Sequence, residues 1–328
     1  MSVVEIKVSH YMPEDHGTHV DFIAPWAAAL ERESGGEVRV AVHSGLSPLG
    51  KLENQYEQVA SGIVDVAHSP ASLPQGRFPR TWLLNLPFLA SGAADGTRML
   101  WSLFERHLRP DYDGLKVLAL HADSGGVLHT RDKPIQRLDD LAGMRLRCPT
   151  GPVADVLAAL GAIPVPLLPP QINQAVRDGA IDGAVMAWDV LAYTQTADVL
   201  RYHVDSKLYV SPLYFVMNDA RYRALPGPAR AAVDAVSGDN LVRNFGTWWS
   251  RWERPGLELA RAPGHVVEHL ATSELDLWRD ATSPVIHAYL DRLAQEGVPD
   301  ARAIYEAALD LRRTSGRDAA DIEIAKGA

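Results

Sequence analysis

The sequence predicts an α/β protein built of two lobes, and three observations lead to that fold class. The chain has 328 residues, of which 47% are hydrophobic, more than a single core normally organises. Strand-like runs alternate with helical ones through the first two thirds, which favours α/β lobes with mainly parallel sheets. After Asp123-Ser124-Gly125-Gly126 the alternation begins again, and we expect this restart to mark the second lobe.

The first lobe is expected to hold four strands with helices between them. Two segments, Trp26–Glu33 and Gly96–Leu108, carry apolar residues at helical spacing. Pro25 should begin or kink the first of these helices. The strand-like runs are Val3–Ser9, Val38–Val42, Ile63–His68 and Leu115–His121.

The second lobe is expected to repeat this pattern. Thr150 and Pro152 are start signals for a helix that ends at Gly161, and Pro169-Pro170 opens another. The chain should then return through a strand at Leu208–Met217. The strands of the lobe itself are expected at Val127–Thr130, Met144–Cys148, Ile163–Leu168 and Gly183–Trp188.

A long helical stretch, Pro228–Ala262, follows and is expected to brace both lobes. It is interrupted by Gly238, Gly246 and Pro255. The elements together predict residues 1–123 with about 212–250 as the first lobe, residues 124–211 with about 251–285 as the second, and residues 286–328 as C-terminal helices that pack on the lobes.

Composition and charge exclude several classes of function. The formal net charge is -9 without a basic cluster, which argues against nucleic acid or an anionic membrane surface as a partner. No apolar run reaches the roughly 18 residues that a membrane helix needs. The single cysteine, Cys148, rules out an intramolecular disulfide and a cysteine-based zinc site. The N-terminus lacks the apolar segment of a signal peptide, which leaves a cytosolic protein or one whose export signal has been removed.

Motifs that would indicate other chemistry are incomplete. Gly45–Leu52 nearly matches a P-loop, but Leu52 stands where a Ser or Thr should hold magnesium. His16 and His19 have the spacing of metal ligands on a helix without a third ligand, and we expect both at a solvated helix start. Nucleophile-elbow and dinucleotide-binding motifs are absent. We therefore expect no cofactor and no metal, and nothing in the sequence demands an enzyme.

A basic strand offers the strongest candidate for ligand binding. Gly143–Pro149, with the glycine-marked run Gly179–Trp188, could bring one guanidinium against an apolar wall. A guanidinium suits a small carboxylate because it has two parallel donors and stays charged. Arg147 is our candidate, with an internal salt bridge as its alternative role. Arg145, which we place on the opposite face of the strand, should be a solvated or structural arginine.

A set of short segments has an order and spacing typical of one known family. The segments are Ser34–Val42, Leu49-Gly50, Ser61–Asp65, Leu86–Leu89, Leu138–Arg147, Leu160–Leu167, Ala175–Gly183 and Phe215–Asn218. In this arrangement, from about Ile6 to about Leu270, the chain resembles the DctP-like solute-binding proteins of tripartite ATP-independent periplasmic (TRAP) transporters.

The resemblance implies a bilobed, periplasmic-binding-protein-like fold with a cleft between the lobes. The cleft would close on a carboxylate and open to deliver it to a membrane permease. The resemblance also implies export to the periplasm and a receptor without catalytic activity. In the family, the arginine that ends the matching strand pairs with the ligand carboxylate, and that position is Arg147 here.

Three positions depart from the sugar-acid binders of the family. Val127 stands in place of a second arginine, Met186 in place of an asparagine and Pro70 in place of an acidic residue. A polyhydroxylated or C4-dicarboxylic ligand would leave unpaired polar groups buried, at about 1 to 3 kcal/mol each. A monocarboxylate with an apolar or aromatic body fits better, and Met186 and Trp188 could form its wall.

Other ligand contacts are expected at strand ends that face the cleft. Asp189 could accept a hydrogen bond from a ligand hydroxyl or cap the helix that begins there. His10 could be a pH-sensitive donor or a core histidine with its hydrogen bonds satisfied. The further candidates are Tyr11, Met12, Ser69 and Pro70 at strand ends, and the aromatic residues Trp82, Phe88 and Tyr214, for which a core role is the alternative.

We therefore expect a periplasmic receptor for a small monocarboxylate, such as an aromatic or branched 2-oxo or 2-hydroxy acid, with TRAP membrane subunits as its partner. A C4-dicarboxylate receptor would need a second cation in the cleft, from Arg77 or Arg80. A small-molecule enzyme on a similar fold would need a catalytic pair, for which Asp189 with His10 is the candidate.

Overall fold

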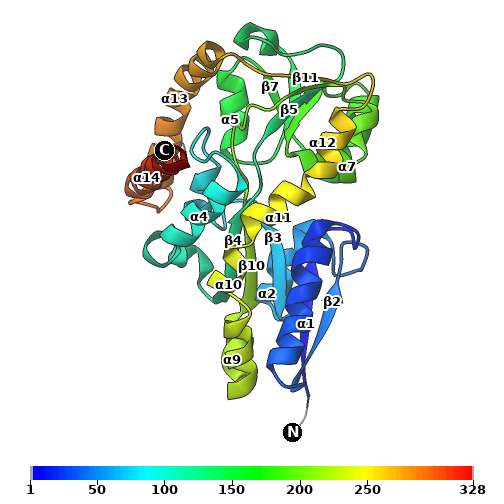
Figure 1. Cartoon of the computed structure of the whole chain (residues 1–328), viewed down its shortest axis with the longest axis vertical. Coiled ribbons are helices and arrows are strands. Elements are labelled where there is room, and N and C mark those ends of the chain that lie inside the picture. Colours follow the sequence, from blue (N-terminus) through cyan, green and yellow to red (C-terminus); the bar gives the residue numbers. More distant parts are fainter. Residues whose placement is uncertain (1–2, 327–328) are drawn as a thin grey trace.

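The protein consists of two α/β lobes, each built on one sheet. The computed structural model describes the backbone of residues 3–326 and the side chains of residues 3–314. In Figure 1 the lobe with the N-terminus lies below the other lobe. The chain leaves the first sheet after Ala122 and re-enters it at Pro212. The predicted bilobed α/β fold is thereby confirmed, whereas the predicted lobe boundaries stay a prediction.

Five strands form the first sheet: β1 (Val4–His10), β2 (Val38–His43), β3 (Val66–Pro70), β4 (Leu115–Ala122) and β10 (Pro212–Asn218). Their order across the sheet is β2-β1-β3-β10-β4. β1 is parallel to β2 and β3, but β10 runs antiparallel between β3 and β4. The sheet is mixed, so the prediction of a mainly parallel sheet was wrong, because β10 returns from the other lobe in the opposite direction.

Six strands form the second sheet: β5 (Val127–Thr130), β6 (Arg145–Cys148), β7 (Ile163–Pro166), β8 (Gly183–Met186), β9 (Tyr202–Val204) and β11 (Val266–Glu268). Their order is β11-β9-β5-β8-β6-β7. β6 is parallel to β7 and β8, whereas β5 is antiparallel to β8 and β9. β8 ends at Met186 and not at Trp188 as predicted, because a helix begins at Trp188.

Helices pack against both sheets. In the first lobe they are α1 (Ala24–Glu33), α2 (Gln55–Ala60), α3 (Pro79–Trp82), α4 (Ala93–Leu103), α8 (Asp219–Ala224), α9 (Gly227–Ala235), α10 (Asp239–Val242) and α11 (Phe245–Trp252). In the second lobe they are α5 (Pro152–Ala159), α6 (Ile172–Arg177), α7 (Trp188–Tyr193) and α12 (Arg254–Ala260). Short π-helical segments lie at Thr18–Ile23 and Phe104–Leu108, and 3-10 turns at Leu52–Asn54, Leu83–Asn85, Arg109–Tyr112, Leu138–Leu141, Pro169–Gln171 and Thr196–Asp198.

The stretch 228–262, which the sequence predicted as an interrupted helical brace, is not one continuous helix. That stretch is divided into α9 to α12, because Gly238 has a φ of +63° that ends regular helix and Pro255 restricts the start of α12. α11 packs against α4 and α12 against α7, so this broken chain of helices still crosses between the lobes. The long helix is α13 (Thr272–Gln295), which runs along both lobes toward α14 (Ala301–Lys326) in Figure 1.

α13 joins the hydrophobic cores of the two lobes. Trp278, near its start, is fully buried in a core cluster of the second lobe. Tyr289 and Leu293, near its end, belong to a core cluster of the first lobe. The carboxyl ends of β1 and β3 in the first lobe and of β6 and β8 in the second lead into one cavity, the usual place for a ligand in open α/β sheets.

Candidate functional site

A cavity of about 220 Å³ lies between the two lobes. It is smaller than the roughly 300–1,000 Å³ typical of sites for drug-sized ligands. Six of the predicted ligand candidates line it: Tyr11, Pro70, Trp82, Arg147, Met186 and Asp189. Residues that were not predicted also contribute, among them Leu52, Asp123, Thr150, Leu167, Leu168, Tyr193, Tyr209, Leu213 and Trp249.

Arg147 lies at the end of β6 and is the cationic side chain among the described residues that line the cavity. Its side chain is 5% exposed. Nε donates to the carbonyl oxygen of Leu167 at 2.8 Å, and Nη1 donates to that of Val185 at 3.2 Å. These two carbonyls fix the plane of the guanidinium, while Nη2 makes no hydrogen bond to a described residue.

The charge of Arg147 has no carboxylate partner among the described residues, so the alternative role in an internal salt bridge does not apply there. Burial lowers the pKa of its guanidinium, although an arginine remains charged at neutral pH. A buried charge is unfavourable unless it is paired and hydrogen-bonded. The geometry is therefore that of a site for an anion.

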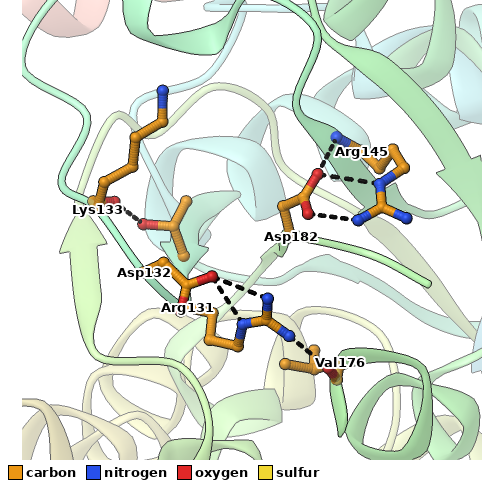
Figure 2. Close-up of polar contacts among 7 residues, drawn as sticks. Arg131, Asp132, Lys133, Arg145, Val176 and Asp182 are labelled. Atoms are coloured by element: carbon orange, nitrogen blue, oxygen red, sulfur yellow. Dashed lines mark hydrogen bonds and ion pairs between the residues drawn. The ribbon is translucent and has the colours of Figure 1, made fainter. Parts of the chain in front are cut away.

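Arg145, at the other end of the same strand, is already paired. Figure 2 shows its guanidinium against the carboxylate of Asp182, at 2.6 Å between Nη2 and Oδ1. Its structural role agrees with our expectation, but the reason that we gave was wrong. Residues two apart in a strand share a face, so the position along β6, and not the face, separates Arg145 from Arg147.

Asp189 reaches the cavity from α7 and contacts the first lobe. Its Oδ2 lies 3.5 Å from Nε2 of His16, and both side chains are almost fully buried. Asp189 does not cap α7, since Ala187 is the capping position and Oδ1 of Asp189 has no hydrogen-bond partner among the described residues. The expectation of a solvated His16 was also wrong, because His16 packs edge-on against Tyr193 of the second lobe.

Asp123 is a second carboxyl of the cavity, and it was not predicted as a ligand residue. It follows β4 where the chain leaves the first lobe, and its Oδ1 accepts hydrogen bonds from the backbone of Ser211 at 2.6 Å and Gly125 at 3.2 Å. Burial, and to a lesser degree the nearby Asp189, raises the pKa of Asp123 to about 7. In the sequence, Asp123 begins the segment Asp123-Ser124-Gly125-Gly126, which marks the crossover between the lobes and could have placed this residue near the cleft.

Aromatic hydroxyl groups and apolar side chains form the remaining walls. Burial raises the pKa of Tyr193 and Tyr209 above the usual tyrosine value, so both phenols are neutral donors near pH 7. Tyr209 donates to the carbonyl oxygen of Val185 at 3.3 Å, the same atom that Arg147 uses. Tyr11 lies over His68 in parallel planes, with ring centroids 6.0 Å apart.

Two predicted ligand residues of the second lobe, Val127 and Trp188, lie outside the cavity. Val127 is buried in the core cluster that also contains Met186, its partner across β5 and β8. Trp188 does not share a strand face with Met186, because α7 begins at Trp188. Its ring contacts those of His129 and His203. Neither Val127 nor Trp188 lines the cavity.

The other predicted residues that do not line the cavity belong to the first lobe. His10 is fully buried and its Nε2 lies 2.9 Å from Nδ1 of His19. Burial, then the neighbouring His19, lowers the pKa of His10 to about 3. Met12 is buried, and Ser69 and Tyr214 are opposite one another within the first sheet.

The two arginines that a C4-dicarboxylate receptor could use as a second cation lie outside the cavity. Arg80 pairs with Asp300 at 2.7 Å, and Arg77 donates to the Tyr56 hydroxyl at 2.6 Å. Neither lines the cavity, so a C4-dicarboxylate lacks its second cation there. Phe88 also lies outside the cavity, whereas Trp82 is part of its wall.

Two other kinds of feature are absent from the part of the chain that the structure describes. No three His, Cys, Asp or Glu side chains gather there in a way that could hold a metal ion. No helix in that part of the chain has the length and hydropathy to cross a membrane.

Comparison with known proteins agrees with this geometry at the level of the family. Residues 8–292 match the family described as bacterial extracellular solute-binding protein, family 7. One relative is the outer membrane transporter protein TsaT of Comamonas testosteroni, 23% identical over 292 residues, which are 86% of this chain and 84% of the relative.

Two solved structures are similar over nearly their whole length. A marine metagenome TRAP solute-binding protein, described as specific for aromatic acid ligands and bound to 3-hydroxybenzoate, has a TM-score of 0.89 at 28% identity, over 95% of this chain and 98% of its own. A TRAP solute-binding protein of Rhodoferax ferrireducens T118, with copurified benzoate, has a TM-score of 0.89 at 28% identity, over 97% of this chain and 100% of its own.

Proposed function

Because this chain belongs to family 7 of the bacterial extracellular solute-binding proteins, the DctP family of TRAP transporter receptors, we propose that it captures a small aromatic monocarboxylate in the periplasm. The membrane subunits of its transporter would then receive the acid. Receptors of this family are not catalytic, so release of the unchanged ligand completes the cycle. Branched 2-oxo and 2-hydroxy acids are the next candidates.

The observation that carries the proposal is the unpaired guanidinium of Arg147 in the interlobe cavity. Two backbone carbonyls hold it in one plane, and the ligand carboxylate supplies the missing negative charge. An arginine–carboxylate pair strengthens when water is excluded, which closure of the lobes achieves. The carboxylate is thus the fixed part of the ligand.

The surroundings of Arg147 favour one carboxylate and an apolar body. The acidic lining residues are Asp123 and Asp189, and a second ligand carboxylate would meet the negative charge of Asp189 and, above the Asp123 pKa of about 7, that of Asp123 as well. Met186 and Leu213 offer apolar surface, and Tyr193 and Tyr209 offer aromatic rings. The two similar structures with 3-hydroxybenzoate and benzoate support an aromatic acid for this chain as well.

Ligand binding should favour the closed arrangement of the lobes. Residues of both lobes line the cavity, for example Tyr11 of the first and Arg147 of the second. A ligand that touches both lobes binds the closed state better than an open one and shifts the equilibrium toward closure. Closure would be the signal that the membrane subunits recognise.

A thermal-shift screen of organic acids tests the proposed function. A ligand at 100 times its dissociation constant adds about 2.7 kcal/mol to the stability of the native state. We expect benzoate, 3-hydroxybenzoate or mandelate to raise the melting temperature, with smaller effects of 4-methyl-2-oxopentanoate and none of succinate, malate or glucuronate. Stabilisation by the dicarboxylates alone would refute the ligand class. Mass spectrometry of the acid that copurifies with the protein is an independent check.

A further inference from the structure

A second cavity lies directly beside the ligand cavity. Its volume is about 510 Å³, and it too is bordered by both lobes. Tyr289 and Leu293 of α13 line it, so the helix that joins the two cores closes one side. The residues that line both cavities are Ser72, Trp82, Thr150 and Pro166. The two spaces therefore share one wall, which contains side chains from each lobe.

Trp82 is the largest side chain of the shared wall, and the first lobe holds it firmly. It ends α3, where the backbone of Thr81 donates to Oδ2 of Asp111 at 2.7 Å and the Thr81 hydroxyl donates to that of Tyr112 at 3.1 Å. Trp82 is only 7% exposed. Its Nε1 has no hydrogen-bond partner among the described residues. Removal of the indole therefore leaves no polar partner unsatisfied.

The indole of Trp82 packs against the backbone of Gly151 in the second lobe. Gly151 precedes α5 and has a φ of +109°, a conformation that side chains rarely adopt. A Cβ atom there would lie 2.1 Å from Nε1 of Trp82, which is far too close. The indole of the first lobe thus packs against bare backbone of the second lobe. Trp82 completes the shared wall only while the two lobes are together.

We propose that Trp82 determines specificity by setting the maximum length of the ligand. The indole ends the ligand cavity, so an acid with a single ring fits, while a second ring would have to enter the neighbouring cavity of about 510 Å³. This inference rests on the proposed function, because it concerns the same carboxylate site. The class that it excludes is two-ring and long-chain aryl acids, such as biphenyl-4-carboxylate and 4-phenylbutanoate.

Calorimetry with benzoate and biphenyl-4-carboxylate tests the proposal on the full chain. In Trp82→Ala the two cavities join, and we expect the two-ring acid to gain affinity by about tenfold or more, since its second ring becomes buried. Trp82→Leu is the second variant, in case the alanine variant does not fold, and should show a smaller gain. Leu168→Ala is the matched control. Leu168 lines only the ligand cavity, so its truncation enlarges that cavity without opening the shared wall.

The outcomes separate this inference from the proposed function. A gain in affinity for the two-ring acid relative to benzoate that occurs only in the Trp82 variants supports the inference. An equal gain in Leu168→Ala, or tight binding of the two-ring acid by the wild type, overturns it while the proposed function stands. If both Trp82 variants bind neither acid, the inference is also overturned, and the role of the indole is lobe closure alone. No binding of any carboxylate by the wild type refutes the proposed function, and the inference falls with it.

Gly151→Ala provides a test from the opposite lobe. A methyl group at Gly151 collides with the seated indole, so we expect benzoate affinity to fall by about tenfold or more because the lobes no longer close fully. The double variant with Trp82→Ala should recover the part of this loss that the collision causes, while the backbone strain of a side chain at a φ of +109° remains. An unchanged affinity in Gly151→Ala would mean that Trp82 is not seated there and would overturn the inference.

Discussion

Arg145 and Arg147 occupy the two ends of one short strand, β6, and their surroundings are opposite. Arg145 is 41% exposed in its side chain and pairs with Asp182 at 2.6 Å, as Figure 2 shows. Arg147 is 5% exposed and donates only to backbone carbonyls among the described residues. The same residue type on the same face of one strand is thus satisfied at one end and left without a counter-ion at the other.

This difference teaches how a strand can carry structure and function at once. At the outer end of β6, solvent screens the pair of Arg145 and Asp182, and such exposed pairs contribute little to stability. At the inner end, little water reaches Arg147, so an unpaired charge there is unfavourable until an anion arrives. In the proposed function, the ligand carboxylate would complete the structure at the inner end, as Asp182 does at the outer one.

Substitution of Arg147 should have the largest effect and would break the comparison directly. We expect Arg147→Ala to weaken binding of the aromatic acid by about 100-fold or more, since a truncated buried charge partner typically costs 2–5 kcal/mol. Arg147→Lys keeps the charge but loses the planar fork, so an intermediate loss is expected. Isothermal titration calorimetry gives both values. Wild-type affinity in Arg147→Ala would show that the carboxylate binds elsewhere.

The acidity of the cavity should make binding depend on pH. Burial raises the pKa of Asp123 to about 7, so the group is largely protonated below that pH and becomes an anion beside the ligand above it. We expect affinity to fall as pH rises from 6 to 8.5, by up to about tenfold per pH unit above pH 7 for one linked proton. Asp123→Asn should flatten this profile. A profile that is as steep in Asp123→Asn would assign the dependence to another group, such as Glu253, whose pKa burial raises to about 8.

The same shift has a consequence for the stability of the ligand-free protein. The pKa of Asp123 in the folded protein lies above that of an unfolded chain, so its protonated form favours folding. This contribution is complete below about pH 4 and is lost as pH rises through about 7. Urea unfolding measured at pH 5 and at pH 8 should show that the free energy of unfolding falls more with rising pH in the wild type than in Asp123→Asn. Equal decreases in the two proteins would contradict the assignment.

Most of the fold could be predicted from the sequence because its signals are local. Strand runs and helix starts are read from neighbouring residues, and β5 was predicted at its observed bounds, Val127–Thr130. β9 and β11 have three residues each and are too short for a recognisable pattern. The direction of β10 depends on how the chain returns from the second lobe, which no local pattern records.

Residues of the candidate site could be predicted only where they belong to a recognisable sequence motif. Arg147 and Met186 follow from their strand segments, and both line the cavity. Asp123, Tyr193 and Tyr209 come from the lobe crossovers and a helix, so their convergence depends on how the lobes pack. Trp188 was predicted as the last residue of a strand and as part of the ligand wall, but β8 ends before it because α7 begins there.

The contact between His16 and Asp189 offers a smaller effect that sharpens the comparison. This buried pair, 3.5 Å apart, joins the two lobes across the cleft. We expect Asp189→Asn to weaken binding by about three- to tenfold, equivalent to roughly 1 kcal/mol, because closure loses an interlobe interaction. Asp182→Asn is the matched control, since it removes a carboxylate from the same lobe on the paired side of β6.

The ligand panel gives this variant a second use. Oδ1 of Asp189 has no partner among the described residues and is free to accept a ligand hydroxyl. If Asp189→Asn weakens 3-hydroxybenzoate and benzoate equally, its role is closure; a greater loss for 3-hydroxybenzoate identifies a hydrogen bond to the ring hydroxyl. An unchanged affinity for both acids would exclude either role.

The smallest effect is expected at Arg145, and it decides whether the two ends of β6 are independent. Arg145→Ala should change ligand affinity by less than about twofold, because its partner Asp182 lies outside the cavity and solvent screens the pair. The melting temperature should fall only slightly, and added salt should reduce the difference from the wild type. A loss of affinity comparable with that of Arg147→Ala would mean that Asp182 and Arg145 hold β6 in register for the ligand. The division between a structural and a functional arginine would then be wrong, since one strand as short as β6 would transmit the loss of its outer pair to its inner charge.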